Sequence, residues 1–280
     1  VYLIVAPLDT GLYPVQRGNY ADAESTALDT FTDRENRFTE TLYLPSGIPV
    51  SDTERERIDR TFDAAEQSIY SRAYNAFSKY SSYLDMETTY DYMILYELFG
   101  NYAGAYLTRY LYDPQQDRFF PSVSPDFEYA ADNDPNEPLT LDAMEMEGTP
   151  YFEALVQSTT FLSGLLERYQ FLMKDLLSSR NVASRIEETA ASLGNAQLRD
   201  WHRWQTVYGD PQYALSSADE NPTDSSLPAL NRNTYSYEQE ITKLGFTISE
   251  HGNYLFSGFS DLFREDDMIG CDAPYVRNTL

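Results

Sequence analysis

The sequence predicts an α+β fold that is mainly helical. Short apolar segments, typical of strands, lie only near the start and in the middle of the chain. Longer segments with apolar residues at spacings of three and four, typical of helices, make up most of the rest. With 280 residues, 42% of them hydrophobic, the chain can bury a sizeable core. We therefore expect one domain over residues 1–265, followed by an irregular tail over 266–280.

The predicted strands are short and bounded by turn residues. Val1–Ala6 is apolar and β-branched, and a proline ends it. Residues 8–40 are polar and contain glycines and prolines, so we expect a long loop there, with room for an edge hairpin. Thr41–Leu44 predicts another strand. Ala105–Tyr112 and Arg118–Val123 predict two more, joined by a turn.

The first predicted helix begins at Ser51 or Asp52 and runs to about Tyr70. Glu54 lies three residues after Ser51, a spacing that fits a capping box. Apolar residues repeat along one face of this segment and predict its buried side. They are Ile58, Phe62, Ala65 and Ile69.

Further helices follow, separated by loops. They are predicted over Ala73–Tyr80, Met86–Phe99, Phe152–Leu177, Val182–Leu193, Ala196–Tyr208 and Tyr237–Phe263. Met86–Phe99 is apolar nearly all round, so we expect it in the core, ending at Gly100. The last helix is expected to be interrupted near Gly252. An acidic loop over 126–147 and a polar loop over 209–234 connect the helices.

The charge of the chain limits its partners. The formal net charge is −25 and the pI is near 4.2. Such a chain repels phosphate backbones and anionic lipid, which argues against nucleic acid and membrane surfaces and suits divalent cations or basic protein substrates. No apolar run is long enough for a membrane span. The 24 tyrosines and a lone cysteine, Cys271, together with the acidity, favour an exported bacterial protein.

Six segments of the chain, taken in order, can be compared with the sequence motifs of known families. They are Val1–Ile4, Tyr83–Asn101, Leu107–Tyr112, Val123–Asn133, Phe161–Tyr169 and Arg232–Leu244. In this order and spacing they resemble the CotH kinase family, whose best-known members are secreted or spore-coat kinases. The resemblance implies a protein-kinase-like C-terminal lobe with a few short strands, in a chain that lacks the N-terminal lobe.

The resemblance also implies a metal site. Asp126 and Glu128 flank Phe127 where the family has D-F-D, so they are the candidate ligands for Mg²⁺ bound with ATP. Hard cations prefer such carboxylate oxygens. Asp132, Asn133 and Asp134 are candidates for additional ligands. The alternative is a solvated acidic loop. Mg²⁺ and ATP are implied by the family resemblance alone.

The candidate catalytic site departs from the family pattern. The family has N-x-D after its central helix, and here Asn101 is present while Ala103 occupies the position of the catalytic aspartate. Alanine cannot orient or accept a proton, so the rate should fall by orders of magnitude. The alternative role for Asn101 is a helix cap. The first lysine, Lys79, is expected at the surface, and Ser124 and Pro125 replace the family's tryptophan.

Other groupings of residues are weaker signals. The two histidines, His202 and His251, are far apart in the sequence, which argues against a shared metal site. Trp201, Trp204 and Tyr208 repeat at helical spacing, which favours a place in the core. If they are exposed, they are candidates for a platform that binds sugar rings.

The function predicted from these observations is that of an exported, cell-surface or extracellular, CotH-family kinase-like domain. If active, it would transfer phosphate from ATP to serine or threonine of a protein substrate; the departures at the site make a degenerate enzyme the other outcome. The alternatives are a non-catalytic adhesion module that binds protein or carbohydrate, and a structural subunit of an extracellular assembly. The oligomeric state is left open.

Overall fold

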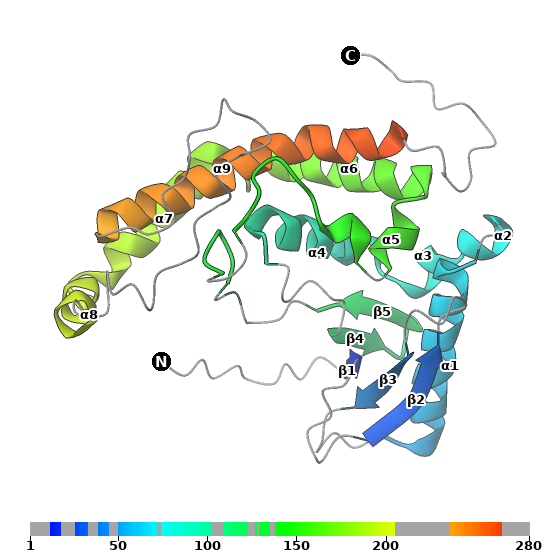
Figure 1. Cartoon of the computed structure of the whole chain (residues 1–280). Helices are drawn as coiled ribbons and strands as arrows, with labels where there is room; N and C mark the ends of the chain where they lie inside the picture. The colour runs from blue at the N-terminus through cyan, green and yellow to red at the C-terminus, as the bar shows by residue number, and fades with distance from the viewer. Residues whose placement is uncertain are drawn as a thin grey trace. The chain divides into compact units, whose positions relative to one another are not determined.

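The structure is a computed structural model (Figure 1). It describes residues 12–17, 26–32, 39–44, 50–71, 74–101, 109–122, 127, 129–134, 138–149, 151–204 and 236–264. The internal contacts divide the chain into two compact units, one of residues 1–92 and 107–124, the other of residues 93–106 and 125–280. The first contains a sheet and helices and the second is helical, so the α+β, mainly helical prediction is confirmed. One domain over 1–265 stays a prediction.

The first unit contains a five-stranded antiparallel sheet with the order β2-β3-β1-β4-β5. Its strands are β1 Tyr13–Arg17, β2 Thr26–Thr32, β3 Thr39–Leu44, β4 Arg109–Asp113 and β5 Arg118–Pro121. The predicted strand at 41–44 is therefore confirmed. The predicted pair joined by a turn is confirmed as β4 and β5, while residues 105–108 and 123 of those predicted strands lie outside the described residues. The predicted strand Val1–Ala6 lies outside the described residues.

Strands replace the long loop predicted over residues 8–40 at two places. The edge hairpin for which the prediction left room is confirmed, because β2 pairs with β3 at the edge of the sheet. The loop prediction is wrong at β1, which lies in the middle of the sheet, between β3 and β4. Pro14 argues against a central strand because it donates no backbone hydrogen bond. Pairing with β4 and the full burial of Val15 outweigh that local signal.

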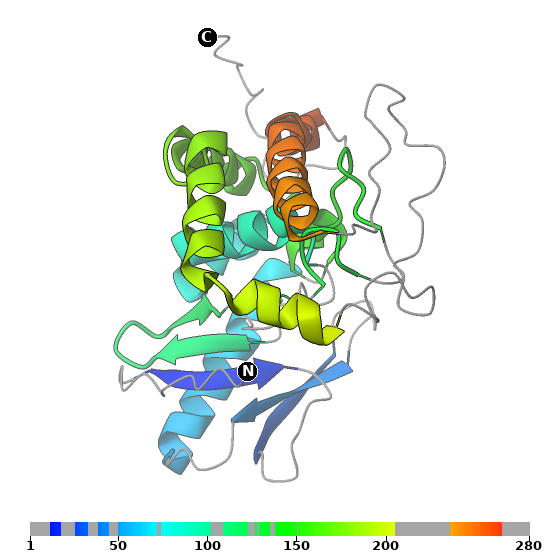
Figure 2. The same cartoon turned by 90° about the vertical axis from the view of Figure 1, so that its left-hand side faces the viewer.

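Helix α1 (Asp52–Ile69) lies across one face of the sheet (Figure 2). It begins as predicted, with a reciprocal capping box between Ser51 and Glu54. The apolar stripe predicted for it is buried. The Phe62 ring meets the rings of Tyr110 and Phe119 edge-on, with centroids 5.4 and 5.0 Å away.

The predicted helix Ala73–Tyr80 is two short helices, α2 (Tyr74–Phe77) and α3 (Tyr80–Tyr83). α4 (Met86–Phe99) matches its predicted bounds, and Asp85 accepts the Thr88 N–H at 3.0 Å at its start. Along the chain, α4 begins in the first unit and ends in the second.

The second unit contains the remaining helices, and α9 lies along α6 and α7 (Figure 1). They are η2 Met146–Gly148, α5 Phe152–Leu155, α6 Thr159–Lys174, α7 Ser179–Leu193, α8 Ala196–Trp204, α9 Tyr237–Asp261 and η4 Leu262–Arg264. The predicted helix 152–177 is divided because Ser158 caps a new helix, accepting the Phe161 N–H at 3.2 Å. The loop 209–234 and the tail 266–280 lie outside the described residues.

The predicted interruption of the last helix at Gly252 is wrong, because α9 continues through it. A Cβ at Gly252 would lie 3.2 Å from Leu98 Cδ1, so this glycine allows close packing on α4. Gly258 likewise allows the close approach of Met144, whose sulfur would lie 2.8 Å from an added Cβ. Among the described residues, no helix is long and apolar enough to cross a membrane.

Candidate functional site

The end of α4 places Asn101, the candidate catalytic-loop asparagine. Gly100 has a φ of 58° and donates its N–H to Glu97 O, and Asn101 N–H donates to Tyr96 O, each at 3.0 Å. These two bonds form a Schellman cap. The helix-cap role proposed for Asn101 is therefore confirmed for its backbone, and the residue is only 2% exposed.

Segment 127–134 begins directly after the candidate ligand Asp126 and contains the other candidate, Glu128; its described residues, 127 and 129–134, are attached to the same end of α4. The Phe127 ring packs against Tyr96 and Phe99, with centroid distances of 5.4 and 6.2 Å. Ala131 N–H donates to Phe99 O at 2.6 Å. Because Phe99 lies two residues before Asn101, this attachment fixes the segment close to the candidate asparagine.

Asp132 attaches the same segment to α9. Its Oδ1 accepts the N–H of Leu139 at 3.0 Å, and its Oδ2 lies 3.7 Å from Lys243 Nζ. That ammonium also donates to the Asp132 carbonyl oxygen at 3.4 Å. The side chains of Asp132 and Lys243 are 3% and 7% exposed, so the ion pair is buried.

A second buried acid contacts the acidic loop further along. The Glu97 carboxylate accepts the N–H of Met146 at 2.8 Å and of Glu145 at 3.2 Å. His251 of α9 lies beside it, with Nε2 at 3.9 Å from the carboxylate and 3.1 Å from Ala143 O. Burial lowers the pKa of His251 below its ordinary value. The neutral ring therefore donates Nε2–H to Ala143, since a carbonyl can only accept.

Sequence reasoning missed these contacts of α9. Lys243, Thr247 and His251 are all buried and repeat at a spacing of four, so α9 presents a polar stripe to the interior of its unit. The signal in the sequence was three polar residues at a spacing of four, but other polar residues of the same helix obscure it. The partners in the acidic loop were not, because they are more than 100 residues away in the chain.

The structure places only part of the predicted site. Ala103, Asp126 and Glu128 lie outside the described residues, so their catalytic and metal roles stay predictions. In the part of the chain that is described, no group of three Asp, Glu, His or Cys side chains is arranged to hold a metal. Carboxylate and amide oxygens are the donors that Mg²⁺ prefers, so the side chains of Asn101, Asp126 and Glu128 fit that ion by type.

The additional ligand candidates and the first lysine have different surroundings. The Asp132 carboxylate is engaged with Leu139 and Lys243. Asn133 is exposed and Asp134 is half-buried. Lys79 is exposed, as predicted.

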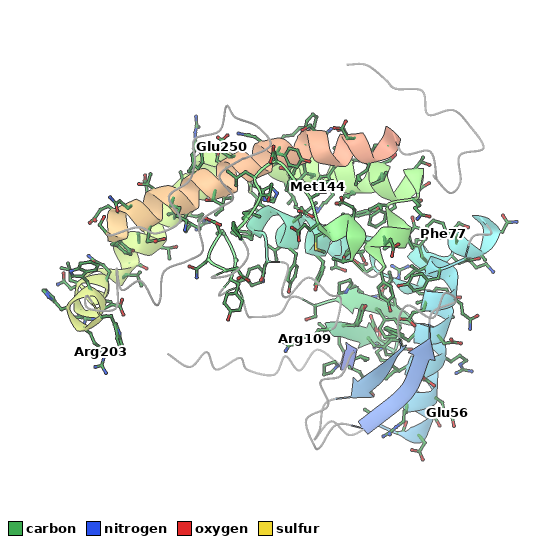
Figure 3. The ribbon with its side chains drawn as sticks, in the orientation of Figure 1. Glu56, Phe77, Arg109, Met144, Arg203 and Glu250 are labelled. Carbon is green, nitrogen blue, oxygen red and sulfur yellow. The ribbon has the colours of Figure 1, made fainter. Side chains whose placement is uncertain are left out.

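The prediction that the tryptophans lie in the core is wrong for Trp204. α8 contains no buried residue, and Trp204 is 45% exposed. The guanidinium of Arg203, which points outward from α8, lies 5.1 Å from the Trp204 ring centroid (Figure 3). Trp201 is half-buried and His202 is exposed. Tyr208 and Cys271 lie outside the described residues.

Comparison with known protein families gives one match. The family model described as CotH kinase protein matches residues 5–252. The chain belongs to the CotH kinase family. This confirms the family predicted from the ordered motifs, and the match includes the positions of Asn101, Asp126 and Glu128. Neither a curated protein nor a solved structure matches this CotH-family chain.

Proposed function

We propose that this CotH-family chain is the metal- and nucleotide-binding part of an exported protein-kinase-like phosphotransferase that acts on serine or threonine of a protein. The observation that carries the proposal is the family match over residues 5–252. The net charge of −25 suits a basic protein substrate.

Phosphoryl transfer needs a metal ion to neutralise the phosphates and a carboxylate to orient the attacking hydroxyl. In the proposed site, Asp126 and Glu128 bind Mg²⁺, and Asn101 orients groups beside it. The ion supplies charge neutralisation when bound. Ala103 supplies no carboxylate, so the chain is proposed to bind Mg²⁺–ATP and to transfer phosphate slowly or not at all.

Binding is tested by calorimetry with Mg²⁺–ATP, on this chain and on the Asp126→Asn and Glu128→Gln variants. We expect saturable binding that both variants weaken by about tenfold or more, because each removes a charged oxygen ligand. Thr140→Ala is the control, since it changes an exposed side chain of the same loop that is not a candidate ligand. Absence of binding at millimolar Mg²⁺–ATP would contradict the proposal for this chain.

Catalysis is tested by restoring the carboxylate. Ala103→Asp should raise phosphate transfer to a basic, serine-rich protein by roughly a hundredfold or more, the usual effect of a positioned acid or base. The assay uses radiolabelled ATP with the full-length protein. If the restored protein binds Mg²⁺–ATP and stays inactive, the degenerate alternative is correct.

The exposure of Trp204 favours a second candidate function, binding of carbohydrate by a non-catalytic surface module. Leu198 on the same helix is 47% exposed, so α8 presents apolar surface to solvent. A sugar ring can stack on an exposed indole, and a neutral ligand meets no repulsion from an acidic chain. A glycan array with the wild type and with Trp204→Ala tests this candidate. Binding that the variant retains would contradict a platform at α8.

A further inference from the structure

Segment 127–134 is placed to influence the proposed site. It follows Asp126 directly in the chain and contains Glu128, and its described residues are attached at two places. One attachment is to the end of α4, where Asn101 is capped. The other is to Lys243 of α9, a residue that the proposed function does not otherwise use.

Lys243 stands out among the lysines of the chain. There are three, and the other two, Lys79 and Lys174, are exposed. Burying an ammonium group is costly unless it is paired. The ion pair with Asp132 compensates part of that cost, yet an apolar pair of similar volume would commonly stabilise the fold as well or better. The buried pair is therefore better explained by fixing a particular geometry than by stability alone.

The backbone at this point is also unusual. Ala131 and Asp132 have φ values of 55° and 67°, in the left-handed region that residues with a Cβ rarely adopt. Two such residues in succession persist only where surrounding contacts determine the conformation. Those contacts come from Phe99, Leu139 and Lys243. Backbone strain of this kind concentrates at functional sites.

We infer that Asp132 and Lys243 are positioning residues, whose buried ion pair fixes segment 127–134 in the geometry that the candidate metal site at Asp126 and Glu128 requires. This inference rests on the proposed function. The pair acts through the backbone of the segment, so its loss should loosen the segment and weaken metal–nucleotide binding together.

The decisive variant is the double substitution Asp132→Asn with Lys243→Met. It removes both charges while keeping the side-chain volumes close to those of the wild type, so that no unpaired buried charge remains. Asp132→Glu is a second variant that keeps both charges and moves the carboxylate by about one methylene. Lys174→Met is the matched control, because it makes the same lysine change at an exposed position.

Two readouts separate a positioning role from a purely structural one. Hydrogen exchange, measured by mass spectrometry, reports on peptides that span residues 127–139 and on α9. Calorimetry reports the affinity for Mg²⁺–ATP. In the double variant we expect exchange over 127–139 to rise at least about tenfold while protection of α9 is kept. The affinity should fall about tenfold, with a smaller fall in Asp132→Glu and none in Lys174→Met.

The outcomes are distinguishable. Unchanged hydrogen exchange over 127–139 in the double variant would overturn the inference, whatever the measured affinity for Mg²⁺–ATP. Faster exchange with unchanged Mg²⁺–ATP affinity would also overturn it, because the segment would then not position the site. If the wild type itself fails to bind Mg²⁺–ATP, the proposed function fails, and the exchange measurement alone decides whether the pair fixes the segment. If the double variant does not fold, Asp132→Glu is judged by the same criteria.

Discussion

Two aspartates, one in each unit, adopt the same rare backbone conformation and contact a cation. Asp117 in the turn between β4 and β5 has a φ of 56°, and Asp132 has a φ of 67°. Asp117 pairs with Arg57 at 3.2 Å, and these side chains are 47% and 39% exposed. Asp132 pairs with Lys243, and both are less than 8% exposed. Among the described residues, an aspartate with a positive φ that pairs with a cation is therefore found both at the surface and in the interior.

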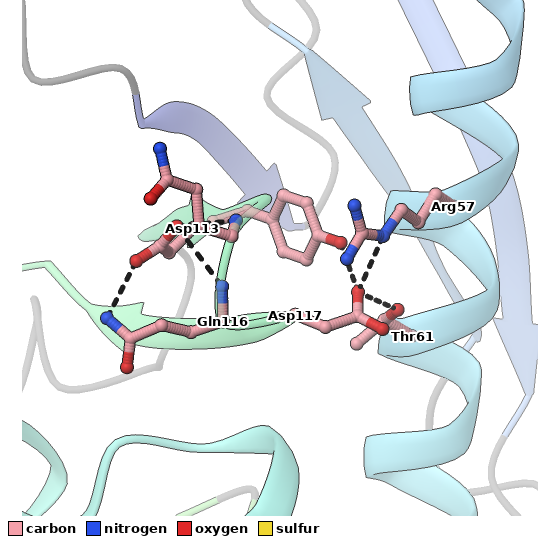
Figure 4. Close-up of polar contacts among 7 residues, drawn as sticks. Arg57, Thr61, Asp113, Gln116 and Asp117 are labelled. Atoms are coloured by element: carbon pink, nitrogen blue, oxygen red, sulfur yellow. Dashed lines mark hydrogen bonds and ion pairs between the residues drawn. The ribbon is translucent and has the colours of Figure 1, made fainter.

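The exposed aspartate distributes its carboxylate over several partners (Figure 4). Besides Arg57, it accepts the hydroxyl of Thr61 at 2.8 Å and the hydroxyl of Tyr112. Burial alone would raise the pKa of Asp117, but the hydrogen bonds and Arg57 outweigh it and lower the pKa below its ordinary value. Water can replace any lost partner there. In the interior it cannot, so the difference in depth predicts a difference in cost.

The largest effect should follow from breaking the buried pair on one side. Lys243→Met leaves the Asp132 carboxylate buried without its cation, and we expect a loss of about 3–5 kcal/mol in the free energy of unfolding. Urea denaturation measures it. Lys174→Met should stay within about 0.5 kcal/mol of the wild type, because that side chain is exposed. A loss below about 1 kcal/mol in Lys243→Met would remove the contrast between the two pairs.

A somewhat smaller effect should follow from adding a side chain at Gly100, the glycine that caps α4. Its added Cβ would lie 2.5 Å from Leu139 Cδ1, and its φ is 58°. Gly148 is the control, because no atom lies within 4 Å of an added Cβ there and its φ is not positive. We expect Gly148→Ala to stay within about 0.5 kcal/mol of the wild type. Gly100→Ala should cost about 1–2 kcal/mol from its left-handed backbone and about 1 kcal/mol more from crowding. Equal losses in urea denaturation would contradict both contributions.

The buried histidine predicts a pH dependence that the surface network lacks near neutrality. Burial lowers the pKa of His251. The His251 ring therefore stays neutral in the folded protein, while in the unfolded chain it takes up a proton near pH 6.5. Stability should be complete above that pH and should fall as the pH decreases below it, by at most about 1.4 kcal/mol per pH unit. Unfolding by urea between pH 7.5 and 5 measures it, with His202→Asn as the exposed control. Loss of the same dependence in His202→Asn would contradict this assignment.

The smallest effect should come from the exposed pair. Asp117→Asn keeps the shape of the side chain and removes its charge, and we expect a loss of about 1 kcal/mol at pH 7. Because the folded pKa of Asp117 is lowered, its contribution is present above the ordinary pKa and is lost as the pH falls below about 3.8. Comparing the urea midpoints of the two proteins at pH 7 and pH 3 tests both statements. A difference that grows at pH 3 would contradict them.

Local chemistry made much of the fold predictable from the sequence. The cap at Ser51 and the end of α4 at Gly100 depend on residues within four positions of each other, and both were predicted correctly. β1 was missed because Pro14 is a local signal against a central strand. Its central position depends on pairing with β4, which is distant in the sequence. Gly252 was misread because its glycine serves close packing on Leu98, which is a tertiary contact.

The same distinction holds for the candidate site. The family motifs located Asn101 and the segment after Phe127, and the structure brings these two together through Phe99. The ion pair between Asp132 and Lys243 joins residues 111 positions apart, so no local pattern reveals it. Metal binding at Asp126 and Glu128 remains a proposal to be tested in solution.

The contrast between the two aspartates is tested most directly by double-mutant cycles on both pairs, measured by urea denaturation at pH 7. One cycle uses Asp132→Asn and Lys243→Met, and the other uses Asp117→Asn and Arg57→Met. We predict a coupling energy of at least about 2 kcal/mol for the buried pair and below about 1 kcal/mol for the exposed pair. Equal coupling energies, or a larger one for Arg57 with Asp117, would contradict the account.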